Sequence, residues 1–234
     1  MSEVCLVSPP ARVFSTFPPF ALMSLAGYLE REGIQTDIVE VKRLPDRTNR
    51  WQEVEDDVCK SIVDRVKASN ARYVGIPCYS SDLRGVKKLA YQIRERMDVI
   101  MIVGGTHATL QPEDLVFPDG PFDLAVLGEG EQTLTEVVRV MNRSGQLKEV
   151  PGLVFCQGGE LYRTSLREPI EDLGTLPIPP YDKIDMAYYL RPNFDLIRHV
   201  LLSGVPVLTS RGCPGLCTFC ANNAIFTSLG LLGT

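Results

Sequence analysis

Three cysteines near the carboxyl end of the chain have a spacing that suits metal chemistry. Cys213, Cys217 and Cys220 follow the pattern Cys-x3-Cys-x2-Cys within the run TSRGCPGLCTFC. A structural zinc site uses four protein ligands, commonly as two separated pairs. One compact loop with three thiols is more typical of an iron–sulfur cluster, so the spacing predicts a 4Fe-4S cluster with one iron left open. A zinc site completed by Cys156 or His199, or plain free thiols, are the alternatives.

The composition is that of an ordinary globular chain and excludes two classes of partner. The chain has 234 residues, of which 44% are hydrophobic, and a formal net charge of −5. It therefore lacks the one-sided basic charge of a nucleic-acid-binding protein. No stretch reaches the roughly 18 apolar residues of a membrane span, and the apolar run at the N-terminus is too short for a secretory signal. We expect a cytoplasmic protein with neither nucleic-acid nor membrane partners.

The other four cysteines are expected to be small core residues. Cys5, Cys59, Cys78 and Cys156 are scattered among apolar neighbours. The total of seven cysteines is odd, and a disulfide framework is improbable in a reducing compartment. The chemistry is therefore expected at the cluster of three.

The first part of the chain alternates short β-branched runs with longer segments of helical period. Strands are predicted within residues 4–8, 36–41, 73–79, 99–105 and 123–128. Apolar stripes predict helices around residues 22–29, 54–66, 83–97 and 134–141, and a shorter helix is expected after the fourth strand. Strand, helix, strand order with nearly continuous apolar strands predicts an α/β fold with a doubly wound, five-stranded parallel sheet.

In such a sheet, ligands bind beyond the carboxyl ends of the strands, so the loops there were the candidate site. Pro9 and Pro10 follow the first strand, which leaves neither the acidic residues of a phosphoacceptor site nor the row of backbone N–H groups that binds FMN phosphate. The run GEGEQT after the fifth strand has only two glycines of a dinucleotide fingerprint, and its two acids would repel a pyrophosphate. A large ligand that takes neutral hydrogen-bond partners remains.

These loops resemble those of the cobalamin-binding domain that precedes radical SAM enzymes. The runs VGGTHATLQPE and LGEGEQTLTEV are similar to that family's loops after strands four and five, and SDL at residues 81–83 resembles the Ser-x-Leu of other B12 domains. The resemblance implies a flavodoxin-like sheet of B12-binding type. It also implies cobalamin contacts from Pro9, Pro10, Ser80, Ser81, Asp82, Leu83, Gly104, Gly105, Thr106, His107, Thr109, Gly128, Glu129, Gly130 and Glu131.

One departure from the mutase-type B12 modules concerns the cobalt ligand. The chain has no Asp-x-His-x-x-G motif. If cobalamin binds, its dimethylbenzimidazole tail is expected to be displaced into the domain, with the cobalt lacking a histidine from that motif. His107 is interpreted as a polar loop residue that contacts a corrin amide or water.

The cysteine loop, SRGCPGLCTFC, is similar to the cluster loop of the radical SAM superfamily. That resemblance implies that S-adenosylmethionine binds the open iron beside Phe219 and is cleaved to a 5′-deoxyadenosyl radical, with electrons from a flavodoxin or ferredoxin. Together, the two resemblances indicate a B12-binding radical SAM enzyme, a methyltransferase or a cyclisation or rearrangement enzyme, acting on a small molecule. A stand-alone cobalamin-binding module and a zinc-stabilised interaction domain are the alternatives.

Three regions are expected along the chain. Residues 1–147 would form the cobalamin-binding domain, 148–203 a hairpin and a Pro-rich linker, and 204–234 the start of a radical SAM domain. The run VPVLTS at 205–210 predicts the first strand of a TIM-like barrel. The chain ends 14 residues after Cys220, whereas such a barrel needs roughly 200 residues. We therefore expect a truncated product that is inactive by itself.

Overall fold

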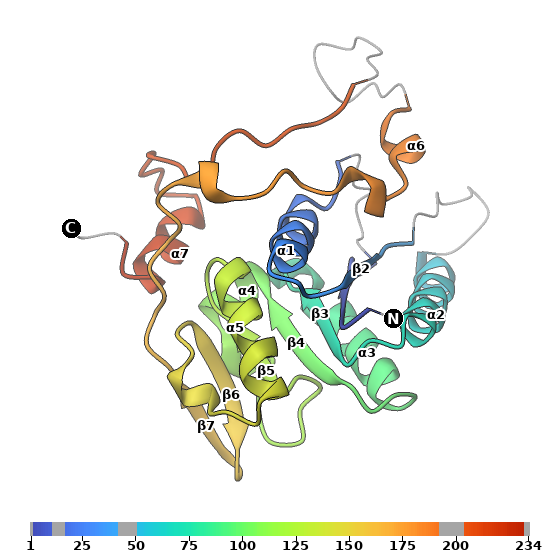
Figure 1. Cartoon of the computed structure of the whole chain (residues 1–234), viewed down its shortest axis with the longest axis horizontal. Coiled ribbons are helices and arrows are strands. Elements are labelled where there is room, and N and C mark those ends of the chain that lie inside the picture. The colour runs from blue at the N-terminus through green and yellow to red at the C-terminus, as the bar shows by residue number, and fades with distance from the viewer. Residues whose placement is uncertain (1, 11–16, 42–50, 192–203, 232–234) are drawn as a thin grey trace.

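Five parallel strands form the centre of the fold (Figure 1). They are β1 (Val4–Val7), β2 (Thr36–Val39), β3 (Tyr73–Pro77), β4 (Ile100–Gly104) and β5 (Leu124–Val126), in the order β2-β1-β3-β4-β5. This is the predicted flavodoxin-like order, and it reverses between β1 and β3. The structure is a computed structural model that describes residues 2–10, 17–41, 51–191 and 204–231, with the backbone alone for 51–55; His199 lies outside these ranges.

A hairpin extends the sheet from five strands to seven. β6 (Leu153–Gln157) pairs antiparallel with β5, and β7 (Glu160–Arg163) pairs antiparallel with β6. The hairpin was predicted, but as part of a region that follows the sheet. Leu153, Val154 and Phe155 are buried, because β6 covers what would otherwise be the open edge of β5. The expected domain boundary after residue 147 would therefore divide the hairpin from the sheet to which it belongs.

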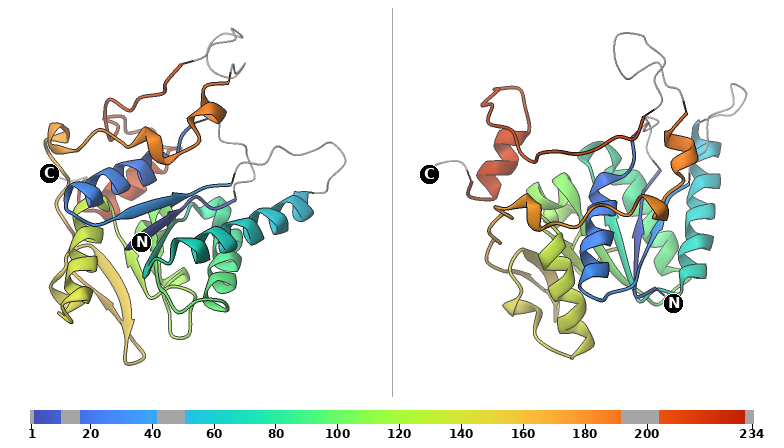
Figure 2. Two further views of the ribbon diagram at one scale, coloured as in Figure 1. Left: turned by 45° about the vertical axis from the view of Figure 1, so that its right-hand side comes forward. Right: turned by 45° about the horizontal axis from the view of Figure 1, so that its top comes forward.

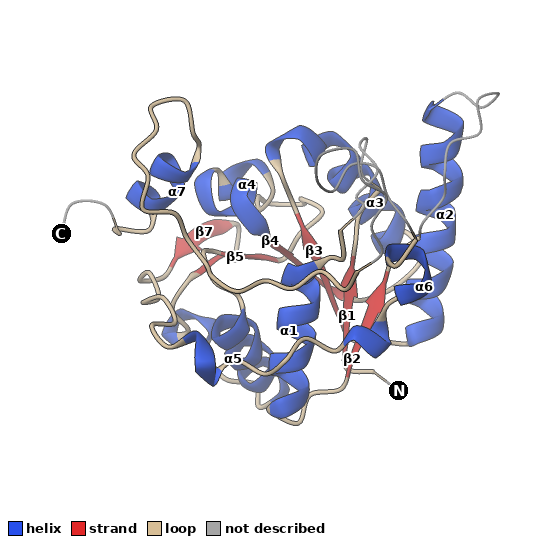
Figure 3. Ribbon diagram, turned by 90° about the horizontal axis from the view of Figure 1, so that it is seen from above, coloured by secondary structure: helices blue, strands red, loops and turns tan. Residues whose placement is uncertain are grey.

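Helices cover both faces of the sheet (Figure 3). α1 (Phe20–Arg31) and α5 (Glu131–Asn142) bury their apolar stripes on one face, and α2 (Trp51–Ser69) and α3 (Leu83–Arg94) on the other. The short helix expected after β4 is α4 (Gly105–Leu110). Within the described ranges, no helix is both long enough and apolar enough to cross a bilayer.

The remaining helical segments are short. The list comprises η1 (Ser80–Asp82), η2 (Pro112–Asp114), η3 (Leu147–Glu149), η4 (Leu173–Thr175), η5 (Tyr181–Lys183), α6 (Met186–Tyr189) and α7 (Asn222–Ser228).

The Pro-rich segment, residues 173–191, is docked on the domain, and we call it the strap. It passes over α1 on its way to α6 (Figures 1 and 2). A Cβ at Gly27 would lie 3.2 Å from Pro180 Cδ, so the absence of a side chain on α1 permits the close approach. Lys183 pairs with Glu30 at 2.6 Å and donates to the carbonyl of Thr36 at 2.7 Å. The strap is thus held by specific contacts along its length.

A second segment returns over the same end of the domain towards α7 (Figure 1). The strand predicted at residues 205–210 is not formed: these residues run without strand pairing, and Val205, Val207 and Leu208 are exposed. A strand requires a neighbour for its backbone groups, and in the described ranges the segment instead contacts the strap, where Tyr181 Oη donates to the Pro206 carbonyl at 2.8 Å. The prediction of a barrel strand here was wrong for this structure.

Two glycines test how tightly the carboxyl edge of the sheet is built. Gly105 has φ +89°, and its Cβ would lie 3.0 Å from the carbonyl oxygen of Cys78; Gly33 has φ +83° with nothing within 4 Å. We predict that Gly33→Ala costs about 1 kcal/mol of unfolding free energy from backbone strain, and that Gly105→Ala costs about 3 kcal/mol because strain and backbone contact add. Urea unfolding followed by circular dichroism measures both; equal losses would contradict the close approach.

Candidate cofactor site

A cavity of about 710 Å³ opens at the carboxyl edge of the sheet. Its floor comes from β1, β3, β4 and β5, one wall from α1, and its cover from the strap and from residues 208–211. Most of the lining side chains are apolar, including Leu6, Phe20, Leu22, Leu25, Ile76, Pro77, Ile102, Val126, Leu134, Leu176, Pro177, Ile178 and Leu208. An apolar cavity with a few polar groups is the usual form of a small-molecule or cofactor site.

Glycine backbone forms the part of the wall nearest the strand ends. Gly104 and Gly105 come from the β4–α4 junction, and Gly128 and Gly130 from the β5–α5 loop. Thr109 ties the two loops together, since its hydroxyl donates to the Gly105 carbonyl and accepts from the Gly128 N–H, each at 3.0 Å. The wall thus lets backbone approach a broad ligand closely, as a corrin ring with its amide side chains requires.

The structure brings together about half of the residues predicted to contact cobalamin. Those lining the cavity are Gly104, Gly105, Thr106, Gly128, Glu129, Gly130 and Glu131. Those outside its lining are Pro9, Pro10, Ser80, Ser81, Asp82, Leu83, His107 and Thr109. At the end of β3 it is Tyr79, and not the following serines, that faces the cavity.

His107 is buried beside the cavity, and within the described residues its Nδ1 has a hydrogen-bond partner while its Nε2 has none. Its Nδ1 lies 2.9 Å from Ser80 Oγ, and its Nε2 lies 3.2 Å from Asp114 Oδ2. Its backbone N–H donates to the Cys78 carbonyl at 3.0 Å. The imidazole therefore links the β3 and β4 loops, and among the described residues that line the cavity there is no histidine.

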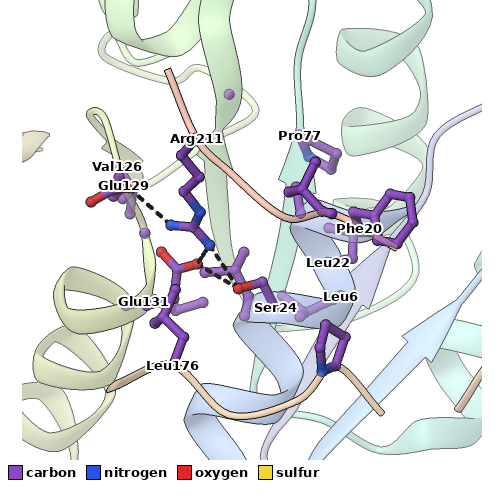
Figure 4. A pocket seen from close by; sticks show the side chains of 18 of the residues that line it. Leu6, Phe20, Leu22, Ser24, Pro77, Val126, Glu129, Glu131, Leu176 and Arg211 are labelled. Atoms are coloured by element: carbon purple, nitrogen blue, oxygen red, sulfur yellow. Dashed lines mark hydrogen bonds and ion pairs between the residues drawn. The ribbon is translucent and has the colours of Figure 1, made fainter. Parts of the chain in front are cut away.

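Arg211 enters the cavity wall from the cysteine-bearing segment (Figure 4). Its Nη1 donates to Glu129 Oε1 at 2.9 Å, and its Nη2 donates to Ser24 Oγ at 2.9 Å and to Glu131 Oε1 at 2.5 Å. Ser24 Oγ also donates to Glu131 at 2.7 Å. Burial raises the pKa of Glu131, but hydrogen bonds from Arg211 and Ser24 outweigh it, so this pKa lies below its usual range.

The cysteine loop lies beside this wall. Cys213 and Cys217 are exposed and Cys220 is partly buried. A Cβ at Gly215 would lie 3.5 Å from Cys213 Sγ and 3.7 Å from Cys217 Sγ, so both sulfurs border the space left by the missing side chain. The part of the chain that the structure describes contains no group of three side chains close enough to hold a metal ion. The three thiols match an iron–sulfur cluster in ligand type and sequence spacing, and two of their sulfurs, those of Cys213 and Cys217, lie near Gly215.

Two further sequence expectations have definite positions. Phe219 is 92% exposed. Cys5, Cys59 and Cys78 are buried and Cys156 is partly buried, as expected for core residues.

Sequence reasoning missed the contributions of α1, the strap and Arg211. One signal was present: Glu129 and Glu131 are two acids in an otherwise neutral loop, and a buried acid needs a cation. Nothing in the sequence alone placed α1 or the strap over the strand ends, because both positions depend on tertiary packing.

The comparisons with known proteins agree with this geometry. The model of the B12 binding domain family matches residues 11–138, which confirms the resemblance read from the loops. An uncharacterized methyltransferase of Pyrococcus horikoshii is 32% identical over 96% of this chain and 46% of its own length. An anaerobic magnesium-protoporphyrin IX monomethyl ester cyclase of Synechocystis is 24% identical over 96% of this chain and 43% of its own length. The chain thus spans less than half of either relative.

Two solved enzymes share the fold. The cobalamin-dependent S-adenosylmethionine radical enzyme OxsB, solved with aqua-cobalamin and S-adenosylmethionine, superposes with a TM-score of 0.62 and 18% identity over 80% of this chain and 25% of its own. The radical S-adenosylmethionine methyltransferase TsrM of Kitasatospora setae was solved with cobalamin and a 4Fe-4S cluster. It superposes with a TM-score of 0.56 and 19% identity, over 70% of this chain and 31% of its own. The chain therefore belongs to the B12-binding domain family, and its fold is that of the matched part of these two enzymes.

Proposed function

We propose that this chain supplies the cobalamin site and the cluster-binding loop of a cobalamin-dependent radical SAM enzyme. The observation that carries the proposal is a shared wall: the glycine loops after β4 and β5 and the segment that leads into the cysteines line one cavity. A stand-alone cobalamin module would have no need for the cysteine segment in its cavity wall.

Cobalamin would occupy the cavity with the corrin against the glycine loops. Backbone groups at Gly104, Gly105 and Gly128, together with the Thr106 side chain, are the neutral partners that corrin amides need. The apolar side chains of α1 and the strap would exclude water from the ring. Since His107 is not among the described residues that line the cavity, we propose that this residue does not ligate the cobalt.

Cys213, Cys217 and Cys220 would hold a 4Fe-4S cluster, with S-adenosylmethionine bound at the open iron beside Phe219. When bound, these groups supply a substrate radical and a cobalt-held methyl group or electron to capture it. The chain's own residues do the positioning: Arg211 fixes the entry to the cysteine loop, and the strap closes the cavity from above.

The reaction that follows from the relatives is methyl transfer or a radical cyclisation on a small molecule. An electron donor such as a flavodoxin or ferredoxin would reduce the cluster. A reducing cytoplasm would suit the donor and the cluster. Because the curated relatives are more than twice as long as the part matched here, the substrate, the complete activity and its partners belong to this proposal.

Filling the cavity tests the cobalamin site. Ala21 lines the cavity from α1 and is exposed, so Ala21→Trp should place a large ring where the corrin would lie and weaken hydroxocobalamin binding about tenfold or more, equivalent to about 1.4 kcal/mol. Lys60→Trp adds the same ring at an exposed position on α2 and should leave binding unchanged. Visible titration and gel filtration measure both. A wild-type protein that retains no corrin colour would sink the proposal.

Removing single thiols tests the cluster loop. Cys213→Ala, Cys217→Ala and Cys220→Ala should each abolish the cluster signal after anaerobic reconstitution with iron and sulfide, because each removes one of three ligands. Corrin retention should persist, since none of the three lines the cavity. Cys156→Ala, on the distant β6, should leave the signal intact. Iron and sulfide analysis with EPR reads the result; a product that holds zinc alone would refute the iron–sulfur assignment.

A further inference from the structure

We propose that Glu131 is a positioning residue that, through Arg211, holds the cysteine loop at the rim of the cavity. The proposal rests on the proposed function only for the identity of the two sites that it connects. The contact itself links α5 of the domain to a segment 80 residues further along the chain.

The acceptor side of this contact is buried and preorganised. Glu131 is the first residue of α5, where the helix dipole favours a negative charge. The residue is 3% exposed, and its carboxylate accepts from Ser24 Oγ of α1 at 2.7 Å. A buried, ionised carboxylate requires a cation nearby, and the guanidinium of Arg211 is that cation (Figure 4).

The donor side reaches three different elements through one guanidinium. Arg211 contacts Glu131 on α5, Glu129 in the β5–α5 loop and Ser24 on α1. The second oxygen of Glu129 accepts from the Ile170 N–H at 2.7 Å, which joins the chain before the strap to the same cluster. A planar, multiply bonded guanidinium fixes its own orientation, as a lysine cannot.

The position of Arg211 turns this cluster into a restraint on the cysteine loop. Only Gly212 separates it from Cys213, and two residues of extended chain span at most about 7 Å. Exposed ion pairs restrain little, but here the acceptor is buried and the arginine side chain is 25% exposed. The thiol of Cys213 is therefore confined to a small region next to the cavity wall.

The test reads loop order in the cofactor-free protein by hydrogen–deuterium exchange. Glu131→Gln and Arg211→Gln should each raise exchange of the Cys220 amide, which donates to the Cys217 carbonyl within the cysteine loop, about tenfold or more, while strands β1, β3 and β4 keep their protection. Exchange in the double variant should be only slightly faster than in the faster of the two single variants, because both substitutions break the same contact. Arg211→Lys keeps the charge without the fork and should fall between wild type and Arg211→Gln.

Arg167 provides a matched control. Its side chain is 14% exposed, and the hydrogen bonds that it makes within the described residues end on Thr133, Gln132 and Glu136 of the same helix α5. Arg167→Gln should therefore loosen its own surroundings and leave the cysteine loop at wild-type exchange. Ser24→Ala is the milder variant if Glu131→Gln does not fold; it removes one hydrogen bond from each partner and should raise loop exchange by a smaller factor.

Two results would overturn the proposal: unchanged loop exchange in Arg211→Gln, or an equal rise in Arg167→Gln. Hydroxocobalamin titration of the wild type is a separate readout. If corrin fails to bind while the loop responds as described, the positioning role stands and the proposed function falls. If corrin binds and the loop does not respond, the proposed function stands and the positioning role falls.

Discussion

The parallel direction of β1, β3, β4 and β5 determines where a ligand can bind in this chain. Parallel strands end at the same edge, so the glycine turns after β4 and β5 meet there although they are far apart in sequence. The approach is close enough that Gly105 lies against the backbone of Cys78. The hairpin β6–β7 closes the β5 side of the sheet and leaves this carboxyl edge as the open one.

A second constraint brings the cysteines to that edge. The strap crosses α1 where Gly27 leaves room for two prolines, and the chain then returns above it to Arg211. Ion pairing with Arg211 offsets the cost of burying Glu131 and of partly burying Glu129, and a neutral cofactor could not supply that charge. The acids predicted to touch cobalamin therefore have another partner, and the cavity wall is shared by two parts of the chain with different chemistry.

The sequence predicted the sheet well and the site only in part. Apolar runs in β1 to β5 and stripes such as Leu22, Leu25 and Leu29 in α1 are local patterns, so strands, helices and strand order followed from them. The addition of β6 to the sheet, the absence of strand pairing at 205–210 and the place of Tyr79 in the cavity lining depend on which neighbours are available in space. Local pattern carries no information about those neighbours, and for the same reason Ser80 was expected at the ligand while it pairs with His107.

The central claim is that one cavity, walled by the strand-end loops and by the cysteine segment, receives the corrin. The most direct measurement is the hydrogen-exchange footprint of hydroxocobalamin on the wild-type chain. The account predicts protection in residues 104–110, 128–134 and 208–211 together, with little change in α2 and β7. Protection confined to other elements, or no protection at saturating corrin, would contradict it.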